Sequence, residues 1–262
     1  HGKKTYEFGD ANNAETHEAW RQGLGPYGDN PAYGAMAPAY GAALAIRRYL
    51  DRYGGSNRDL GHVAVSLRAH AQLNPHAYRR SPMTIDDYQN SRWIIDPLRL
   101  FDCSQNQEGG AVLLITTAER VHAGPQYHNF AHVGLGIAQQ DNFTYRPDNL
   151  RIYEKAGVDR RDVDSIAVYD AFSPVILYAL ERFGFCGPGE ALDFVREGNI
   201  GPGGTLPVNT SGGMLSEGHV GGWNLFIEVV RQLRGECDAR QVKDAKVIQW
   251  ANFLGDSIIF RN

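Results

Sequence analysis

Hydrophobic and polar positions change their spacing repeatedly along this chain, and each change predicts a different element. Apolar residues three and four positions apart predict amphipathic helices, whereas short apolar runs between turn residues predict buried strands. The predicted helices span residues 38–53, 148–156, 173–183, 189–197 and 223–234. The predicted strands span residues 62–67, 110–116, 165–169, 246–250 and 256–260. This alternation of helices and strands favours a layered α/β fold.

Composition and charge exclude several classes of function. The chain has 262 residues, of which 42% are hydrophobic and 21% charged, and its net charge of −4 argues against a nucleic-acid binder. No apolar run reaches the length of a membrane span, and the first residues show no secretory signal, so we expect a cytoplasmic protein. Its three cysteines lack the spacing of metal ligands, so we expect no metal site.

The stretch 205–222, which reads TLPVNTSGGMLSEGHVGG, holds the most conspicuous polar group of the chain. Two glycine pairs flank His219, and a predicted helix begins directly afterwards at Trp223. Glycine lets the backbone approach a ligand closely, and the N-terminus of a helix favours anionic or oxyanionic groups. From spacing alone, a glycine-rich loop that caps a core helix explains the stretch equally well.

Two other polar segments lie at the ends of predicted strands. Residues 169–172, Tyr-Asp-Ala-Phe, end one strand, and residues 249–256 form a hairpin-like end between the last two strands. In open α/β folds the ends of strands line ligand sites, so we expect both segments to lie near His219.

Four motifs in a fixed order carry a resemblance to a known family. They are DPLRLFDCSQNQEGGAVLLITTAERV from Asp96, VYDAFSPVILYALERFGFCGPGE from Val168, VNTSGGMLSEGHVGG from Val208 and RQLRGECDARQVKDAKV from Arg231. From about Asp96 to its end, the chain resembles the C-terminal half of the thiolase superfamily, particularly the sterol-carrier-type branch.

The resemblance implies an αβαβα sandwich of two similar halves, with the N-terminal half incomplete in this chain. Residues 1–95 then belong to the loop region of the N-terminal half, residues 96–122 are its closing strand segment, and residues 123–262 are the C-terminal domain. Members of the family are usually dimers that act on acyl-CoA thioesters. We therefore expect coenzyme A as part of the substrate and no other cofactor.

The same resemblance gives roles to three residues. His219 falls on the histidine of the family's Gly-His-Pro loop, with Val220 in place of the proline. Tyr169 falls on the Asn or His of an earlier motif, and both side chains can donate to the oxygen of an enolate. Asp170 either orients a neighbouring group or caps the helix that begins at Ser173.

Five further residues are candidates for substrate binding because they lie in the same loops. Asn209 and Asn252 can position a water or contact the thioester, although both are equally typical of turns. The glycines allow close approach of a ligand. The candidates are Asn209, Gly212, Gly213, Gly218 and Asn252.

Two departures from the family pattern bear on the choice between its chemistries. The nucleophilic cysteine of thiolases lies on a segment that precedes the residues seen here, and Cys103, Cys186 and Cys237 do not match it. The last motif, at residues 250–252, carries neither cysteine nor histidine. We therefore expect retro-aldol cleavage of a β-hydroxyacyl-CoA, as in steroid side-chain-cleaving aldolases, which work with a small OB-fold partner protein.

Two alternatives stay open at this point. A thiolase, which transfers an acyl group through a cysteine, requires a nucleophile outside this segment. A non-catalytic carrier of acyl-CoA or lipid leaves the polar residues Tyr169, Asp170 and His219 without a purpose.

Overall fold

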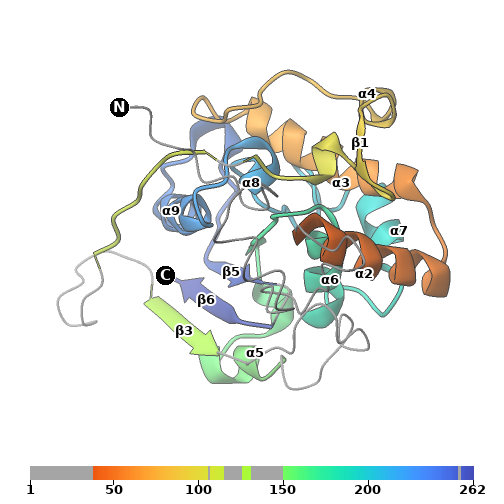
Figure 1. Cartoon of the computed structure of the whole chain (residues 1–262). Helices are drawn as coiled ribbons and strands as arrows, with labels where there is room; N and C mark the ends of the chain where they lie inside the picture. The colour runs from red at the N-terminus through yellow and green to blue at the C-terminus, as the bar shows by residue number, and fades with distance from the viewer. Residues whose placement is uncertain (1–37, 106, 115–125, 131–149, 253–254) are drawn as a thin grey trace, which may run out of the picture.

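The computed structural model describes all residues except 1–37, 106, 115–125, 131–149 and 253–254. Its centre is a four-stranded sheet in the order β3–β6–β5–β4, which lies between helices (Figure 1). Neighbouring strands in this order are antiparallel, except that β4 and β5 are parallel. The strands are β3 (Gln126–Phe130), β4 (Ser165–Val168), β5 (Val247–Ala251) and β6 (Ser257–Arg261).

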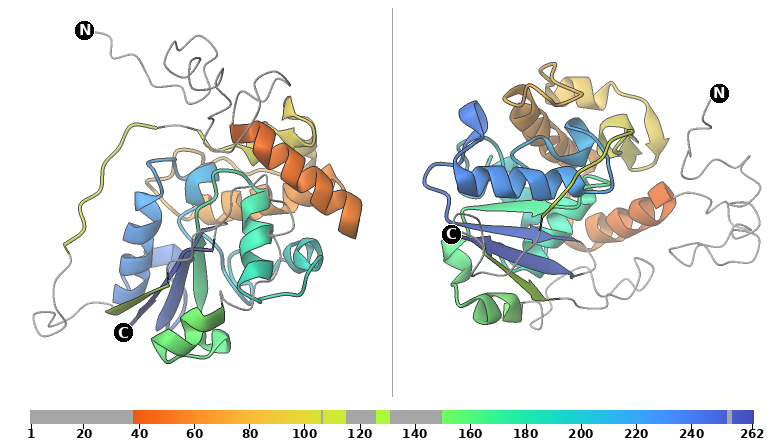
Figure 2. Two further views of the ribbon diagram at one scale, coloured as in Figure 1. Left: turned by 60° about the horizontal axis from the view of Figure 1, so that its bottom comes forward. Right: turned by 90° about the vertical axis from the view of Figure 1, so that its left-hand side faces the viewer.

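The two faces of this sheet pack into separate apolar clusters because side chains alternate along each strand. Ile166 and Val168 of β4 face the larger cluster, which also contains helix α6 (Pro174–Arg182). Ala167, between them, faces the smaller cluster with helix α9 (Trp223–Arg234). Figure 2 shows α9 and α6 on opposite sides of the strands.

The larger cluster also receives the helices that precede the sheet in sequence. Helix α3 lies against α7 and α8, and α2 carries a small hairpin of strands β1 and β2 against its surface. The remaining elements are α2 (Pro38–Tyr53), α3 (Asn57–Gln72), α4 (Ile85–Gln89), β1 (Trp93–Ile95), β2 (Leu98–Arg99), α5 (Arg151–Ala156), α7 (Ala191–Arg196) and α8 (Gly213–Ser216).

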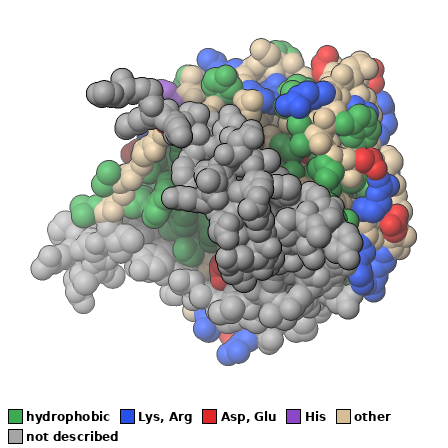
Figure 3. All heavy atoms as spheres, viewed as in Figure 1, with side chains coloured by type: hydrophobic (Ala, Val, Ile, Leu, Met, Phe, Trp, Pro, Cys, Tyr) green, Lys and Arg blue, Asp and Glu red, His purple; other side chains and the backbone are tan. Residues whose placement is uncertain are grey.

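The surface of the described residues is mixed in charge. Basic and acidic side chains are interspersed on the face shown in Figure 3. Helix α2 itself exposes Arg47, Arg48 and Arg52 beside Asp51. None of the described helices combines the length and the apolar character that crossing a membrane requires.

The periodicity located most elements correctly. Helices α2 and α9 have the predicted bounds, and strands β4, β5 and β6 fall within a residue of the predicted runs. Helices α5, α6 and α7 lie inside their predicted segments, which begin earlier or end later.

The strand predicted at residues 62–67 is wrong, because these residues lie in the middle of helix α3. The fully buried Leu60, Val63 and Leu67 recur at three- and four-residue spacing along this helix. Over six residues, that pattern also reads as alternation, so a short window favoured the wrong period.

The buried strand predicted at residues 110–116 is also wrong over its described part. Residues 110–114 form no strand, and Val112 and Leu114 are 94% and 93% exposed. A strand buried on both faces needs neighbours on each side, and none of the described strands pairs with this segment. Residues 115 and 116 lie outside the described residues.

The proposed loop region, residues 1–95, is largely helical where it is described. Helices α2, α3 and α4 occupy much of residues 38–95 and form part of the larger cluster. The resemblance named this region by its place in the family fold, whereas its apolar spacing decides its secondary structure.

One buried histidine links the stability of this helical layer to pH. His70 of α3 is 2% exposed, and its Nε2 lies 2.9 Å from the carbonyl oxygen of Ile200. Burial lowers the pKa of His70 from 6.5 to about 4, so the folded chain keeps the ring neutral while the unfolded chain protonates it.

We therefore expect the contribution of His70 to stability to be lost as pH falls from 6.5 to 4. The stability difference between wild type and His70→Gln should shrink by up to about 3 kcal/mol over this range. Chemical denaturation at several pH values measures this difference. Parallel stability curves for the two proteins would contradict the prediction.

Candidate active site

Tyr169 and His219 lie in direct contact. The phenol oxygen of Tyr169 is 3.1 Å from Nε2 of His219, and the two rings meet edge to face with centroids 5.8 Å apart. Tyr169 follows β4, and its backbone N–H donates to the carbonyl of Ala251 on β5 over 2.9 Å. The tyrosine is therefore placed by the end of the sheet, as its position in the sequence predicted.

A third side chain, that of Ser104, contacts the other ring nitrogen of His219. Oγ of Ser104 lies 2.9 Å from Nδ1 of His219. The backbone N–H of Ser104 donates to the carbonyl of Ala171, and Cys103 forms an antiparallel bridge with Phe172. The segment around Ser104 thus extends along the residues that follow β4.

Sequence reasoning missed Ser104. It lies inside the first of the four motifs, directly after Cys103, but no spacing connects it to a histidine 115 residues away. The only available signal was that this motif and the His219 loop belong to the same family pattern.

Burial keeps the rings of Tyr169 and His219 neutral. Burial lowers the pKa of His219 below its ordinary value. Burial, together with the nearby charge of Asp170, raises the pKa of Tyr169. Among the described residues, no carboxylate makes a hydrogen bond to either ring, so the pair offers polar hydrogens and lone pairs rather than charge.

Asp170 points away from this pair and anchors the loop that carries His219. Its carboxylate is fully buried and accepts hydrogen bonds from the backbone N–H groups of Met214 at 2.8 Å and Leu215 at 3.2 Å. Burial raises its pKa to about 7, although these hydrogen bonds oppose the shift. The alternative that Asp170 caps the helix beginning at Ser173 is therefore wrong, because its carboxylate binds N–H groups of α8 instead.

The helix expected to begin at Ser173 is held differently. The hydroxyl of Ser173 donates to the carboxylate of Asp102, and its backbone N–H donates to the Asp102 carbonyl over 3.0 Å. Asp102 also accepts from the phenol of Tyr88 at 2.6 Å and from the backbone of Arg99 at 2.7 Å. This buried carboxylate fixes the segment that leads into Ser104.

Asn209 is held by backbone groups. Its side chain accepts from the N–H of Val168 at 2.7 Å and donates to the carbonyl of Val168 at 2.9 Å. Its own backbone adopts a positive φ of 52°. The side-chain amide therefore continues the hydrogen bonding of β4, which favours the turn alternative for this residue.

The two glycines that follow are required by close packing. A Cβ at Gly212 would lie 2.6 Å from Cβ of Ala71, and a Cβ at Gly213 would lie 2.3 Å from the carboxylate of Asp170. These contacts are with the protein's own residues and explain both glycines without a ligand.

Gly218 and Asn252 also have structural partners. A Cβ at Gly218 would lie 2.3 Å from the side-chain oxygen of Gln107. Asn252 closes the β5–β6 turn, where its side-chain oxygen accepts from the N–H groups of Gly255 and Asp256 at 3.0 and 3.1 Å. The described structure therefore brings Tyr169 and His219 together and places the other predicted site residues in the scaffold around them.

Glu217, which precedes Gly218, ties the loop to its surroundings. The carboxylate of Glu217 accepts from Ser211 at 2.6 Å, from Asn224 at 2.7 Å and from Asn74 at 3.3 Å. Burial raises the pKa of Glu217. Three donors from three segments thus fix the backbone two residues before His219.

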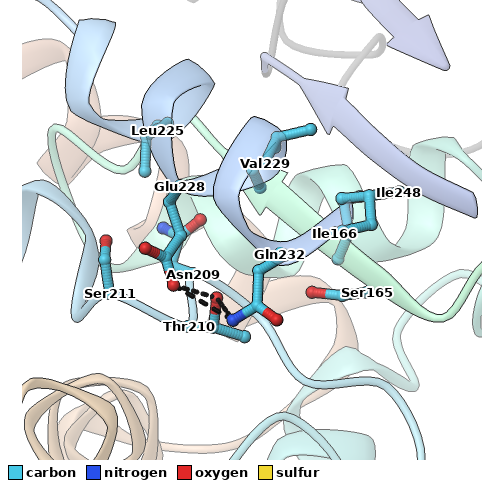
Figure 4. Close-up of a pocket in the computed structure, with 11 residues that line it drawn as sticks. Ser165, Ile166, Asn209, Thr210, Ser211, Leu225, Glu228, Val229, Gln232 and Ile248 are labelled. Atoms are coloured by element: carbon cyan, nitrogen blue, oxygen red, sulfur yellow. Dashed lines mark hydrogen bonds between the residues drawn. The ribbon is translucent and has the colours of Figure 1, made fainter. Parts of the chain in front are cut away.

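A small cavity lies beneath α9 and not at the tyrosine–histidine pair. Figure 4 shows Glu228, Gln232 and Thr210 directed toward one another beside it. Glu228 also binds the guanidinium of Arg240 through two hydrogen bonds of 3.0 Å and one of 3.2 Å. The hydroxyl of Thr210 donates to Glu228 at 2.8 Å, so this network anchors the start of the loop.

The three cysteines are poor candidates for a nucleophile. All are free thiols, with Cys237 buried and the other two partly buried. Burial raises the pKa of each thiol, to about 12 for Cys103 and Cys237. Reactive cysteines have a lowered pKa, so none of the three is activated in this structure.

Comparison with known proteins identifies the family. Residues 144–253 match the family described as "Thiolase C-terminal domain-like". The 17-hydroxy-3-oxo-4-pregnene-20-carboxyl-CoA lyase of Mycobacterium tuberculosis is 40% identical over 218 residues, which are 78% of this chain and 56% of that protein. The chain belongs to the thiolase superfamily.

Other relatives of this thiolase-superfamily chain support the same family assignment. The steroid side-chain-cleaving aldolase of Thermomonospora curvata is 37% identical over 82% of this chain and 62% of that protein. A solved structure described as "Ltp2-ChsH2(DUF35) aldolase" superposes with a TM-score of 0.80 at 34% identity, covering 88% of this chain and 65% of that one. The chain thus spans about three-fifths of the length of these two curated relatives.

The contact between Gly213 and Asp170 can be tested with a matched pair of substitutions. Gly213 and Gly221 have similar φ values of 62° and 67°, but a Cβ at Gly221 meets nothing closer than 3.7 Å. Both alanine variants place a side chain at a positive φ, and only Gly213→Ala also displaces the side chains of Asp170 and Asn209.

We expect Gly213→Ala to lower the free energy of unfolding by about 1–3 kcal/mol more than Gly221→Ala. Urea denaturation of the two variants and the wild type measures the difference. Equal losses of stability would show that the side chains of Asp170 and Asn209 do not hold the loop at this point.

Proposed function

We propose that this chain carries the active site of an aldolase that cleaves the Cα–Cβ bond of a β-hydroxyacyl-CoA of the steroid side-chain type. The observation that supports this most is the neutral pair of Tyr169 and His219, in a chain whose described cysteines are not activated. The names of the two curated relatives, a CoA-thioester lyase and a side-chain-cleaving aldolase, support the same chemistry.

The reaction needs a hydrogen-bond donor more than a nucleophile. An acceptor takes the proton of the β-hydroxyl, the oxygen forms a carbonyl with Cβ, and the Cα–Cβ bond breaks. The electron pair of that bond forms the enolate of the thioester, which then takes a proton at Cα. Negative charge develops on the thioester oxygen, and donors fixed around this oxygen lower the barrier.

Tyr169 and His219 supply polar groups for this oxygen from fixed positions. One is held at the end of β4 and the other by the loop anchored on Asp170 and Glu217. Preorganised groups stabilise the transition state because they need no reorganisation during the reaction. No metal or redox cofactor is part of this proposal, and coenzyme A enters with the substrate.

Thiolase chemistry is the second candidate, because His219 falls on the histidine of the Gly-His-Pro loop. It requires a thiolate outside the described residues, since burial raises the pKa of all three cysteines described here. A carrier without catalytic activity does not use the contact between Tyr169 and His219.

We also propose an assembly of two kinds of subunit. The similar solved structure is described as "Ltp2-ChsH2(DUF35) aldolase", and the second component in this name supports a small partner for the present chain, expected to carry an OB fold. A homodimer of the thiolase-like subunit is part of the same proposal. The free cysteines are typical of a reducing compartment, which supports a cytoplasmic location.

The reaction can be tested with 17-hydroxy-3-oxo-4-pregnene-20-carboxyl-CoA, the thioester in the name of the mycobacterial relative. We expect a free ketone and a shortened acyl-CoA without added coenzyme A, and no acyl adduct in the intact mass of the protein. A requirement for added coenzyme A, with an acyl adduct, would support thiolase chemistry and contradict the proposal.

Substitution of Tyr169 tests its part in this reaction. Tyr169→Phe should lower kcat by roughly 100-fold or more with a smaller change in KM, because its hydrogen bond strengthens only as the enolate forms. Steady-state kinetics check this, with Tyr78→Phe as the control, since Tyr78 is 68% exposed. An unchanged kcat in Tyr169→Phe would remove the phenol from the mechanism.

A further inference from the structure

We propose that Gln107 is a substrate-binding residue whose side-chain amide pairs with the amide group of the coenzyme A arm next to the thioester. This inference rests on the proposed function, because that function places the thioester carbonyl at Tyr169 and His219. The position of the Gln107 amide itself rests on contacts among the described residues.

Two segments of the chain approach each other closely beside His219. The backbone N–H of Gln107 donates to the carbonyl of His219 over 3.3 Å. Each segment carries a glycine where the other presents a side chain. A Cβ at Gly109 would lie 2.6 Å from Cγ1 of Val220, and a Cβ at Gly218 would collide with Oε1 of Gln107. Glycine at both places therefore allows the two backbones to lie together.

Gly218 shows where the amide of Gln107 lies. Besides meeting Oε1, a Cβ at Gly218 would lie 3.1 Å from Cδ and 3.7 Å from Nε2 of Gln107. Both polar atoms of the amide are therefore close to the backbone of the residue that directly precedes His219. The space that Gly218 leaves beside the catalytic pair is used by a polar group.

This amide has no protein partner in the described part of the chain. A glutamine side chain offers two N–H donors and one carbonyl acceptor, and the backbone N–H is the group through which Gln107 bonds to His219. The residue is half-buried. A polar group in such a place binds water in the free protein, and a ligand can replace that water.

Gln105 of the same segment is different in both respects. It is exposed, and its side-chain oxygen accepts from Nε of Arg79 over 3.2 Å. The contrast shows that the segment binds one glutamine to the scaffold and leaves the amide of the other, beside His219, without such a bond. Gln105 is therefore a matched control for Gln107.

The chemistry of a CoA thioester supplies a partner for this amide. The arm of coenzyme A contains secondary amides, and the nearest one lies two methylene groups from the thioester sulfur. A secondary amide has one N–H and one carbonyl, which match the acceptor and the donors of a glutamine side chain. The match does not depend on which way the Gln107 amide is turned, because both kinds of group are present on each side.

The location of Gln107 also fits this short spacing. Gly218 is bonded directly to His219, so the Gln107 amide lies beside the residue that, in the proposed function, contacts the thioester oxygen. The amide of the arm keeps its charge and shape while the Cα–Cβ bond breaks. Gln107 therefore binds substrate and transition state equally, and its loss should change KM and not kcat.

The test measures binding of two probes that are not cleaved. Both are thioesters of the acyl group in the name of the mycobacterial relative, made without the β-hydroxyl that retro-aldol cleavage requires. One is the N-acetylcysteamine thioester, which keeps the amide. The other is the S-pentyl thioester, in which methylene groups replace that amide. Titration calorimetry gives the affinity of wild type, Gln107→Ala and Gln105→Ala for each probe.

We expect Gln107→Ala to weaken binding of the N-acetylcysteamine probe roughly 3- to 10-fold, the worth of one or two neutral hydrogen bonds. Binding of the S-pentyl probe should not change, and Gln105→Ala should bind both probes like the wild type. Equal weakening of the two probes by Gln107→Ala, or no weakening of either, would overturn the proposal.

Gly218→Ala provides a second route to the same amide. Its Cβ displaces the Gln107 side chain, so this variant should also lose affinity for the N-acetylcysteamine probe relative to the S-pentyl probe. In a Gln107→Ala background, the same substitution should cause no further amide-specific loss. Additive losses would contradict the proposal. Circular dichroism checks folding, and if Gly218→Ala does not fold, the comparison of Gln107→Ala with Gln105→Ala decides alone.

The binding measurement separates this inference from the proposed function. An amide-specific loss in Gln107→Ala supports the subsite even if the aldolase assay shows no cleavage. In that assay, Gln107→Ala should raise KM for the CoA thioester by a similar factor with little change in kcat. Cleavage with an unchanged KM in Gln107→Ala would support the reaction and overturn the role of Gln107.

Discussion

Two side chains beside the end of β4 satisfy buried backbone groups, and the position of His219 depends on both. Asn209 bonds the N–H and the carbonyl of Val168, as a neighbouring strand would. Asp170 accepts the first free N–H groups of α8. Backbone groups left without partners in this buried region would cost a substantial part of the stability of a domain. The loop is therefore attached to the sheet at two points, and the polar pair is a consequence of that attachment.

The neutrality of the site sets it apart from a serine–histidine–aspartate triad. In such a triad, a carboxylate next to the imidazole stabilises the charged ring that forms when the histidine takes a proton. Here a hydroxyl occupies the corresponding place, and burial lowers the pKa of His219 further. A charged imidazolium is disfavoured on both counts. The arrangement is suited to stabilising a charge on the substrate rather than to forming one on the protein.

The sequence predicted the strands and helices around the site well because the responsible signals are local. Helix α9 begins after Gly222 and ends before Gly235, both with positive φ, and glycine marks such positions in a sequence. Helix α3 was misjudged over residues 62–67 because a six-residue window does not separate the two periods. The motif order located Tyr169 and His219. The partners of Ser104 and Asp170 depend on tertiary contacts that no local pattern records.

The two hydrogen bonds of the His219 imidazole connect it to two different parts of the chain. The contact with Tyr169 joins the loop to the central sheet, whereas the contact with Ser104 joins it to a segment that continues toward the largely exposed residues 108–114. Local opening has the lowest free energy where few buried contacts oppose it. Ser104 is itself tied to the residues after β4, because its N–H donates to the carbonyl of Ala171 over 3.0 Å. An opening that starts in the exposed segment therefore has to break this backbone hydrogen bond before the imidazole loses its second partner.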